Sequence, residues 1–350
     1  MPDAQTIVDA LRKVHFPGIE RDIVSLGYLK DIQEEDGRFL VRLELSTNQQ
    51  GAGERIEEEA HAALRATGVP YHLEMHVRYL PSGKEETEAE PERLLGGVPV
   101  KIAVASGKGG VGKSTVAANL AIGLARLGVR TGLLDADIYG PSIPMMLGLE
   151  GTQPRVVDHR MEPVERYGIR SMSIGYLVDR HTPMVWRGPM AGKAIEQLMS
   201  DVDWEGTEAL VFDLPPGTGD VQISISQKIR LTGAIIVTTP QEVALIDAGK
   251  GVSMFRKVSV PILGLVENMS YFVCPHCNGQ TDIFGSGGGA REAARLEIPL
   301  LGQIPFDPQV VLGGDEGSPV LIRNPESPAG QAFLALAARV AGLTGLGPAV

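Results

Sequence analysis

The order of hydrophobic and polar positions in the first 80 residues predicts a small α+β unit. Apolar side chains recur at helical spacing over residues 7–14, and the charged segment 54–67 predicts a second helix. Hydrophobic and polar residues alternate over 39–45 and again over 71–77, as on strands with one buried face. We therefore assign residues 1–80 to one small α+β domain.

The next segment has no hydrophobic pattern. Residues 81–97 read PSGKEETEAEPERLLGG, with five Glu, two Pro and three Gly. Such a composition offers almost nothing to bury, and it is typical of a linker between domains. We therefore place the domain boundary there.

From residue 98 onward, short runs of Val, Ile and Leu without alternation are separated by helical stretches. Runs of this kind are typical of strands buried on both faces of a parallel sheet. The runs are KIAVAS, TGLLDAD, ALVFDLP, AIIVTTP, ILGLVEN and LLGQIP, and the helices lie near 113–127, 219–230 and 243–256. Residues 98–350 are therefore predicted to form a doubly wound, mainly parallel α/β domain, with a less regular strand excursion over 155–189.

Composition narrows the classes of protein. The chain has 350 residues, of which 43% are hydrophobic and 21% charged, as in folded globular proteins. Its net charge of −11 argues against a surface that binds nucleic acid. No apolar run is long enough to span a bilayer, and the N-terminus lacks the hydrophobic stretch of a secretory signal. With only two cysteines, we expect a cytoplasmic protein that binds neither nucleic acid nor membrane.

A glycine-rich segment after the first buried run predicts a phosphate site. GKGGVGKST matches G-x-x-x-x-G-K-[ST] between a strand and a helix, where glycines let backbone N–H groups converge on phosphate oxygens. The helix N-terminus adds its dipole. Lys113 is predicted to reach the β- and γ-phosphates of ATP, and the Ser114 hydroxyl to coordinate Mg²⁺. The predicted loop residues are Gly107, Lys108, Gly109, Gly110, Val111, Gly112, Lys113, Ser114 and Thr115.

Lys108 distinguishes this loop from a general phosphate loop. A second lysine in GKGGVGKST resembles the deviant Walker A ATPases related to MinD, ParA and the nitrogenase iron protein. The resemblance implies that Lys108 reaches across a homodimer interface to the partner's nucleotide, so that hydrolysis depends on dimer closure. A solvated lysine near the phosphates is the alternative.

Carboxylates follow two further strand runs, at the edge where parallel sheets bind ligands. In LLDADIYGPS, Asp137 matches the position that orients the attacking water in this superfamily, and Asp135 is expected either to cap the turn or to hold Mg²⁺ through water. In VFDLPPGTGD, Asp213 ends an apolar strand as a Walker B aspartate does, with a helix cap as the alternative. Gly217 and Gly219 would allow a loop that senses the γ-phosphate.

The adenine is expected to bind near the last strands. Asn268, in VENMSY, offers the donor and the acceptor that the adenine edge needs, and it matches the base-contacting asparagine of the superfamily. Pro305 and Asp307, in QIPFD, lie where relatives place the other wall of the purine site. Simple turn chemistry is the alternative for both of them.

The two cysteines, Cys274 and Cys277, form a C-P-H-C segment after the run that carries Asn268. A redox disulfide is one interpretation, although no thioredoxin-like βαβ start surrounds the pair. A structural zinc site is another, but it needs four ligands, and His276 between the thiols is poorly placed to be one. In the third, two thiolates from each of two protomers give the four ligands of a [4Fe–4S] cluster.

Several segments together resemble the Mrp/ApbC iron–sulfur cluster carrier ATPases. GKGGVGKST, DADIYGPS, DLPPGTGD, TTPQEVALID, ENMSYFVCPHC and IFGSGGG occur in this order at suitable separations, over about residues 98–325. The resemblance implies a homodimeric ATPase that holds a cluster between its protomers. It would receive the cluster from a cluster-assembly scaffold and pass it to apo iron–sulfur client proteins.

The first domain resembles the PaaD-like domain that is often fused to bacterial members of this family. Relatives commonly carry a Thr-x-x-x-Cys-Pro element after the strand, whereas residues 47–51 of this chain read TNQQG without a thiol. Metal binding by this domain is therefore not expected, and a scaffold-docking or client-docking role stays open.

Two other functions would keep the fold. A positioning ATPase of the MinD type should end in a basic amphipathic helix, but the chain ends AGLTGLGPAV; the ParA type needs a basic face for DNA. A reductase of the iron-protein type has its ligating cysteines far apart in sequence. Either function would leave the C-P-H-C segment to a structural zinc.

Overall fold

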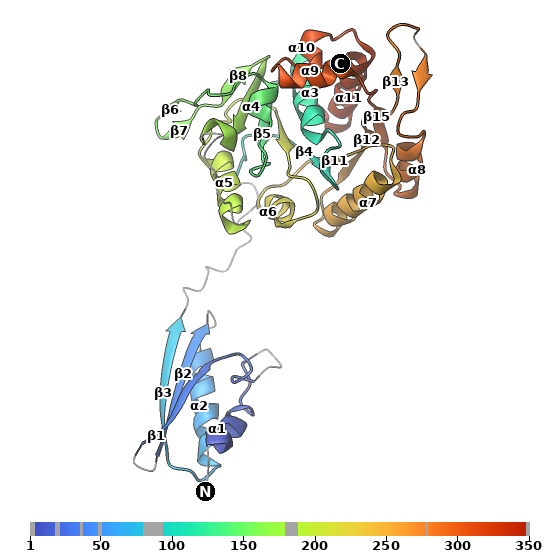
Figure 1. Ribbon diagram of the computed structural model, residues 1–350. Helices are drawn as coiled ribbons and strands as arrows, with labels where there is room; N and C mark the ends of the chain where they lie inside the picture. The colour runs from blue at the N-terminus through green and yellow to red at the C-terminus, as the bar shows by residue number, and fades with distance from the viewer. Residues whose placement is uncertain are drawn as a thin grey trace. The chain divides into compact units, whose positions relative to one another are not determined.

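The computed structural model describes residues 4–17, 22–35, 38–47, 51–79, 94–178, 188–277 and 279–347. It divides into two compact units, Met1–Ala89 and Glu90–Val350 (Figure 1). The linker predicted over 81–97 lies outside the described residues as far as residue 93.

The first unit is a three-stranded sheet with two helices. Its elements are α1 (Ala4–Leu11), β1 (Leu29–Glu35), β2 (Arg38–Thr47), α2 (Ala52–Arg65) and β3 (Tyr71–Tyr79). The central strand β2 runs antiparallel to β1 and parallel to β3. As the alternation predicts, Phe39, Val41, Leu43 and Leu45 of β2 are buried, and they pack with residues of α1 and α2.

The second unit is built on an eight-stranded sheet. In chain order its strands are β4 (Val100–Ser106), β5 (Thr131–Asp135), β8 (Val164–Arg166), β9 (Ile169–Ser173), β10 (Ala209–Asp213), β11 (Gly233–Thr238), β12 (Ile262–Glu267) and β15 (Leu300–Gln303). Their order across the sheet is β15-β12-β11-β4-β10-β5-β9-β8, and only β8 runs antiparallel to its neighbour. The predicted doubly wound, mainly parallel sheet is therefore present. The strand excursion expected over 155–189 supplies β8 and β9 at one edge of the sheet.

Helices cover both faces of this sheet (Figure 1). One face carries α3 (Lys113–Arg126), α4 (Ile143–Met146), α9 (Pro308–Asp315), α10 (Val320–Arg323) and α11 (Pro328–Thr344). The other carries α5 (Gly188–Ser200), α6 (Asp220–Lys228), α7 (Glu242–Lys257) and α8 (Gly288–Arg295). Two hairpins, β6 (Val156–Val157) with β7 (Arg160–Met161) and β13 (Phe272–Val273) with β14 (Gln280–Thr281), and the short η1 (Ile174–Tyr176) complete the unit.

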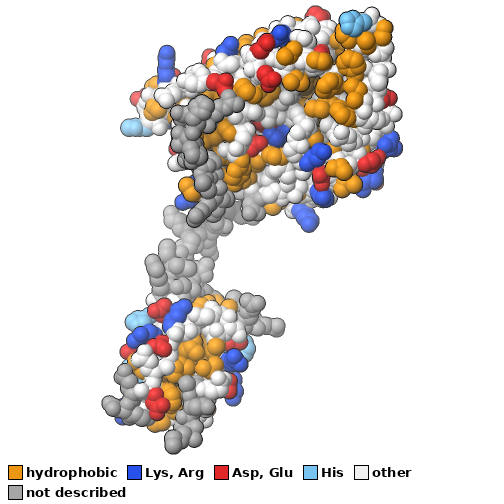
Figure 2. All heavy atoms as spheres, viewed as in Figure 1, with side chains coloured by type: hydrophobic (Ala, Val, Ile, Leu, Met, Phe, Trp, Pro, Cys, Tyr) orange, Lys and Arg blue, Asp and Glu red, His pale blue; other side chains and the backbone are white. Residues whose placement is uncertain are grey.

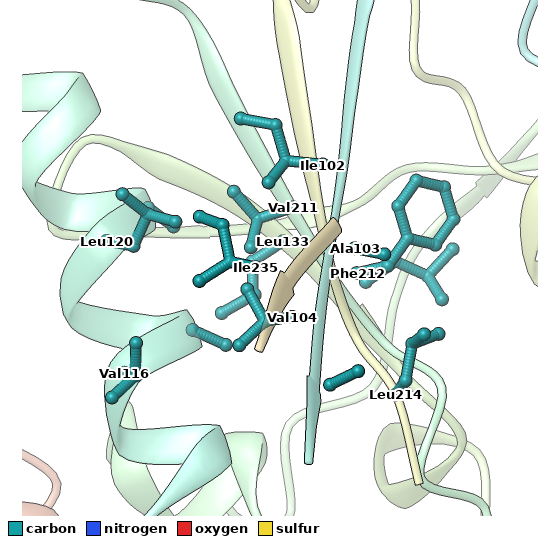
Figure 3. Packing of buried hydrophobic residues seen from close by; sticks show 14 of the residues in the cluster. Ile102, Ala103, Val104, Val116, Leu120, Leu133, Val211, Phe212, Leu214 and Ile235 are labelled. Carbon is teal, nitrogen blue, oxygen red and sulfur yellow. The ribbon is translucent and has the colours of Figure 1, made fainter. Parts of the chain in front are cut away.

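The core explains why the strand runs do not alternate. Every residue of β4 is buried. Figure 3 shows Val211 and Ile235 on the side of α3, and Phe212 and Leu214 on the opposite side of the sheet. Because both faces are covered by helices, both faces of each central strand need apolar side chains.

The surface carries no large region of one charge on the side in view. Figure 2 shows basic and acidic side chains intermingled on the visible face of each unit. Among the described residues, no helix is both long enough and apolar enough to cross a membrane.

Candidate functional site

The carboxyl edge of the large sheet holds a cleft of about 350 Å³. The loop between β4 and α3 forms its floor, and segments after β5, β10, β12 and β15 form its walls. The lining residues include Gly109, Gly110, Gly112, Lys113, Ser114, Thr115, Asp137, Pro216, Asn268, Pro305 and Asp307. The fold thus brings the predicted phosphate, carboxylate and purine segments to one place.

The glycines of the loop are needed for its shape. Gly110 and Gly112 both have φ near 80°, a left-handed conformation that other residues rarely adopt. A Cβ at Gly112 would overlap the Asn268 amide, and one at Gly107 would overlap the Asp247 carbonyl. Helix α3 begins after Gly112 without a side-chain cap, so no side chain at that position satisfies its first backbone N–H groups. This cradle fits an anionic phosphate.

Lys113 is buried at the centre of the site, with 6% of its side chain exposed. Its Nζ lies 2.5 Å from Oδ1 of Asp213 and 3.8 Å from Oδ2 of Asp137, and it donates to Oγ of Ser114 at 3.2 Å. A buried ammonium group is tolerated only with such partners, because desolvation of an isolated charge is costly.

Asp213 keeps one oxygen without a partner. Its Oδ2 is fully buried and accepts no hydrogen bond from any described residue. Buried polar atoms of this kind normally bind water or an ion. Together with the nearby Ser114 hydroxyl, this carboxylate offers the hard oxygen ligands that Mg²⁺ requires.

Asp135 is fully buried beside Asp213, its partner in the β5–β10 register. It accepts hydrogen bonds from the backbone N–H of Asp137 at 3.1 Å, from that of Ile143 at 3.3 Å and from Oγ of Ser173 at 3.0 Å. Burial, and next the nearby Asp213 charge, raise the pKa of Asp135 to about 8, against the opposing effect of Lys113. The hydrogen bonds to the Asp135 side chain thus hold in place the loop that carries Asp137.

Asp137 lines the cleft and is 13% exposed. Burial raises the pKa of its carboxyl above the usual value, and Asp213 adds to this while Lys113 opposes it. Raised pKa values of this kind are common among carboxyl groups at functional sites.

Asn268, Pro305 and Asp307, the residues expected to contact the adenine, line one part of the same cleft. Asn268 is 6% exposed, and its Nδ2 donates to the carbonyl of Val111 in the phosphate loop at 2.9 Å. Asp307 accepts from the backbone N–H of Gln309 at 2.8 Å and thereby caps α9. The turn chemistry considered for Asp307 is therefore present.

Sequence reasoning missed an apolar wall of the same cleft. Met145 and Met146 of α4 line it together with Val310 and Val311 of α9. The IPMM stretch after DADIYGPS was the available signal for the α4 residues. The α9 residues had no signal, because their place depends on how α9 packs near α4.

Lys108 differs from the other loop residues. It is half-buried, and it is not among the described residues that line this cleft. Oγ of Ser106 donates to its carbonyl at 2.9 Å and so fixes the backbone there. Among the described residues, Lys113 therefore lines the cleft and Lys108 does not.

The loop after Asp213 is held by one side chain. Gly217 has φ near 96°, and its N–H donates to the Ser106 carbonyl at 2.9 Å. Nε2 of Gln222 donates to the carbonyls of Pro215 and Gly217 at 2.7 and 3.1 Å. Gly219 precedes α6 and gives it no side-chain cap.

The two thiols lie at the tip of the β13–β14 hairpin. Cys274 is half-buried, Cys277 is exposed, and both are free. The backbone N–H groups of His276 and then Cys277 lower the pKa of the Cys274 thiol below its usual value. His276 is exposed. Among the described residues, no three His, Cys, Asp or Glu side chains are grouped so as to hold a metal ion.

The hairpin is joined directly to the wall of the cleft. The backbone N–H of Phe306, a lining residue, donates to the Tyr271 carbonyl at 2.7 Å. Phe306 also forms a parallel β-bridge with Phe272 of β13, and the two rings lie 6.4 Å apart. The cleft wall at Phe306 and the thiol-bearing hairpin therefore form one hydrogen-bonded strip.

Comparison with known proteins gives consistent results for both units. Residues 97–341 match the family described as NUBPL iron-transfer P-loop NTPases, and residues 4–70 match the iron-sulfur cluster assembly protein family. An iron-sulfur cluster carrier protein of Synechocystis sp. is 40% identical over 347 residues, 98% of each chain.

Solved structures resemble the second unit. A nucleotide-binding protein of Archaeoglobus fulgidus, in complex with ADP and with cobalt found in it, is 37% identical with a TM-score of 0.61, covering 71% of this chain and 97% of its own. The cell division ATPase MinD of Pyrococcus furiosus shares the fold at a TM-score of 0.52 and 23% identity, covering 70% of this chain and all of its own.

Proposed function

The chain belongs to the family of NUBPL iron-transfer P-loop NTPases, and on that basis we propose that it is an ATP-hydrolysing iron–sulfur cluster carrier. In this proposal it acts as a homodimer, in which Cys274 and Cys277 of each protomer hold a [4Fe–4S] cluster as cargo. It receives the cluster from an assembly scaffold and releases it to apo client proteins.

The observation that carries the proposal is the strip between the cleft and the thiols. Asn268, at one end of it, contacts the phosphate loop, and Cys274 lies only a few residues further along the chain. The Phe306–Tyr271 hydrogen bond and the Phe272–Phe306 bridge connect the same segment to the far wall of the cleft. A ligand in the cleft therefore contacts the segment that positions the thiols.

The phosphate end supports binding of ATP with Mg²⁺. When ATP enters, Lys113 exchanges Asp213 for phosphate oxygens, and this exchange leaves the Asp213 carboxylate and the Ser114 hydroxyl as ligands for Mg²⁺. The bound metal would neutralise charge on the β- and γ-phosphate oxygens. Asn268, Pro305 and Asp307 would hold the adenine.

For hydrolysis, Asp137 orients a water molecule in line with the γ-phosphate, and Lys108 of the second protomer stabilises the charge that develops. Asp137 is suited to this because it faces the cleft beside Lys113. Lys108 is suited to it because its side chain does not line its own cleft. Hydrolysis then depends on how the two protomers associate.

At the thiol end, the exposure of the hairpin suits cargo. The lowered pKa of Cys274 favours the thiolate, which is the form that binds iron. Each protomer supplies two of the four thiolates that a [4Fe–4S] cluster needs, so two protomers complete the set. Release is then a ligand exchange in which client thiolates replace Cys274 and Cys277 without a redox step.

The test is anaerobic reconstitution of the full chain with iron and sulfide, followed by metal and sulfide analysis and transfer to an apo client enzyme. We expect one cluster for every two protomers, and loss of iron, sulfide and visible absorption in the Cys274→Ser, Cys277→Ser double variant. His276→Ala is the matched control, because His276 is exposed on the same hairpin and is expected to leave cluster binding intact.

Two results would contradict the proposal. One is a double variant that binds iron and sulfide as the wild type does. The other is a colourless wild type that holds zinc in proportion to its thiols, which would favour a structural metal at the hairpin.

A further inference from the structure

The segment IFGSGGG, which the nucleotide and thiol chemistry leaves unexplained, ends against a buried carboxylate. Glu267 is the last residue of β12 and is fully buried. Its Oε2 accepts the backbone N–H of Gly289 in the first turn of α8. Its Oε1 accepts from Oγ of Ser270 at 2.6 Å and from Nε2 of Gln303 at 2.7 Å.

The glycines of this segment allow the close approach. A Cβ on Gly289 would lie 2.6 Å from Oε2 of Glu267, and one on Gly288 would lie 2.6 Å from the Pro240 carbonyl oxygen. Helix α8 has no side-chain cap at Gly287, so the Glu267 carboxylate satisfies its N-terminus in place of a cap. The glycines of IFGSGGG thus allow the Glu267 carboxylate to lie against the N-terminus of α8.

On the side of the cleft, Glu267 fixes the turn that presents Asn268. The bond from Ser270 closes this turn around Met269, whose φ of 54° is unusual for a residue other than glycine. The backbone N–H of Asn268 donates to the Thr238 carbonyl at 2.8 Å, and its side chain donates to the phosphate loop. The position of Asn268 therefore depends on the Glu267–Ser270 bond.

On the side of the thiols, the same turn begins the strip that leads to the hairpin. The Glu267 carbonyl accepts from the N–H of Ile304 at 2.9 Å, and the N–H of Ser270 donates back to the Ile304 carbonyl at 2.9 Å. Tyr271 and Phe272 follow, and the cysteine hairpin comes directly after them. One carboxylate thus joins α8, β15 and the turn between the cleft and the thiols.

We propose that Glu267 is a positioning residue through which occupation of the nucleotide cleft alters the environment of Cys274 and Cys277. Asn268 senses the ligand, the turn that Glu267 closes moves or stiffens as a unit, and the hairpin follows because it continues from that turn. The inference rests on the proposed nucleotide site and is independent of which metal or cluster the thiols hold.

The experiment uses the full chain, metal-free and reduced, and follows the reaction of its thiols with 5,5′-dithiobis(2-nitrobenzoic acid). Because Cys274 and Cys277 are the only cysteines, the rate reports on the hairpin alone. In the wild type, Mg–ATP should change this rate by about threefold or more relative to the nucleotide-free protein, as a population shift of the hairpin would.

The variant is Glu267→Gln, which has one acceptor oxygen in place of two and so cannot accept from Gly289 and from Ser270 and Gln303 together, which breaks the link between α8 and the turn. We expect its thiol rate to become independent of Mg–ATP. We also expect KM for ATP to rise about tenfold with kcat within about twofold of wild type, the pattern of lost ground-state binding. A variant that is merely less folded would lower kcat and leave KM unchanged.

Glu292→Gln is the matched control. Glu292 lies on the same helix, is only 9% exposed, and forms its ion pair with Arg295 of that helix at 2.6 Å. It should keep both the wild-type KM and the ATP-dependent thiol rate. Should Glu267→Gln fail to fold, Ser270→Ala removes a single donor and should show the same two changes at smaller size.

Each result of these experiments either supports or overturns the role inferred for Glu267. Wild-type KM and a wild-type nucleotide effect in Glu267→Gln, or in Ser270→Ala where it replaces that variant, would overturn the inference. So would thiols of the wild type that react alike with and without bound Mg–ATP. Because ATP binding is measured separately, a wild type that binds no ATP would instead overturn the proposed function along with it.

Discussion

The phosphate end of the site and the thiol hairpin are connected through Asn268, which donates to the phosphate loop and precedes the hairpin, yet they are built in opposite ways. Lys113 and Asp213 are 6% and 0% exposed and hold each other in place. Cys277 is exposed, and Cys274 is only half-buried at the tip of a two-stranded hairpin. The charges of the phosphate end are buried and paired within the chain, whereas the thiols lie at the surface, where the proposed second protomer or client would reach them.

The largest effect that tests this contrast is expected from Lys113→Ala. Removal of the Lys113 ammonium group leaves Asp213 and Asp137 without their shared cation. Breaking a buried ion pair of this kind lowers the free energy of unfolding by about 3 kcal/mol. Hydrolysis should fall about 1000-fold in kcat/KM, because the phosphate charge loses its main partner. Urea unfolding and steady-state kinetics measure the two changes.

Lys250→Ala is the control for a lysine outside the core. Lys250 pairs with Asp247 at 2.8 Å, but 66% of its side chain is exposed. Exposed pairs contribute little, so the variant should stay within about 0.5 kcal/mol of wild type. Equal losses in the two variants would show that burial does not distinguish the phosphate end.

Lys108→Ala should separate the two lysines of the loop. Since Lys108 does not line its own cleft, ATP affinity should change by less than about threefold, while kcat falls about 100-fold as when one charge-stabilising donor is lost. In an equimolar mixture with Asp137→Ala, activity should partly return, because a mixed dimer contains one intact composite site. No recovery at any protein concentration would assign Lys108 to its own nucleotide.

The sequence was sufficient for the phosphate end because its signals are local. GKGGVGKST is contiguous, and the apolar runs KIAVAS, TGLLDAD and ALVFDLP lead directly to the loop glycine or to a carboxylate. The six predicted apolar runs, and the sheet edge at which Asp135, Asp137 and Asp213 lie, follow from that pattern and the rules of parallel sheets. The cleft lined by these segments is where the pattern predicts a ligand site.

The parts that sequence reasoning missed depend on contacts between distant residues. Glu267 was overlooked because a glutamate at a strand end gives no sign of its burial, and its partner Gly289 is far away in the chain. The wall formed by Met145 and Val311 requires α4 to pack near α9, which no local pattern specifies. The strands β8 and β9 are short, so their alternation was too brief to place them in the main sheet.

Asp135 allows a test by pH that only the buried end should show. Its pKa is raised from 3.8 to about 8 in the fold, so the folded state retains a proton that the unfolded state has lost. The stabilisation from this bound proton is fully present below the unfolded-state pKa of 3.8 and is lost as the pH rises through the folded-state pKa of about 8. Its loss lowers the free energy of unfolding by up to about 1.4 kcal/mol per pH unit.

In the nucleotide-free protein, Asp135→Asn should therefore flatten the loss of stability between these two pKa values, as measured by urea unfolding across pH. Asp203→Asn is the control, since Asp203 is partly exposed, pairs with Arg160 at 3.8 Å and accepts the Glu205 N–H at 3.2 Å. Identical slopes in wild type and Asp135→Asn would mean that another group holds the proton.

The smallest effect is expected at the thiols. Because Cys277 is exposed on a hairpin tip, Cys277→Ala in metal-free protein should change the free energy of unfolding by less than about 0.5 kcal/mol. Leu120→Ala, at a fully buried position of α3, should cost about 3 kcal/mol in the same assay. If Cys277→Ala instead approached the cost of Leu120→Ala, the hairpin would be part of the structural core. The thiols would then be held for the fold of one protomer, and the contrast with the phosphate end would fail.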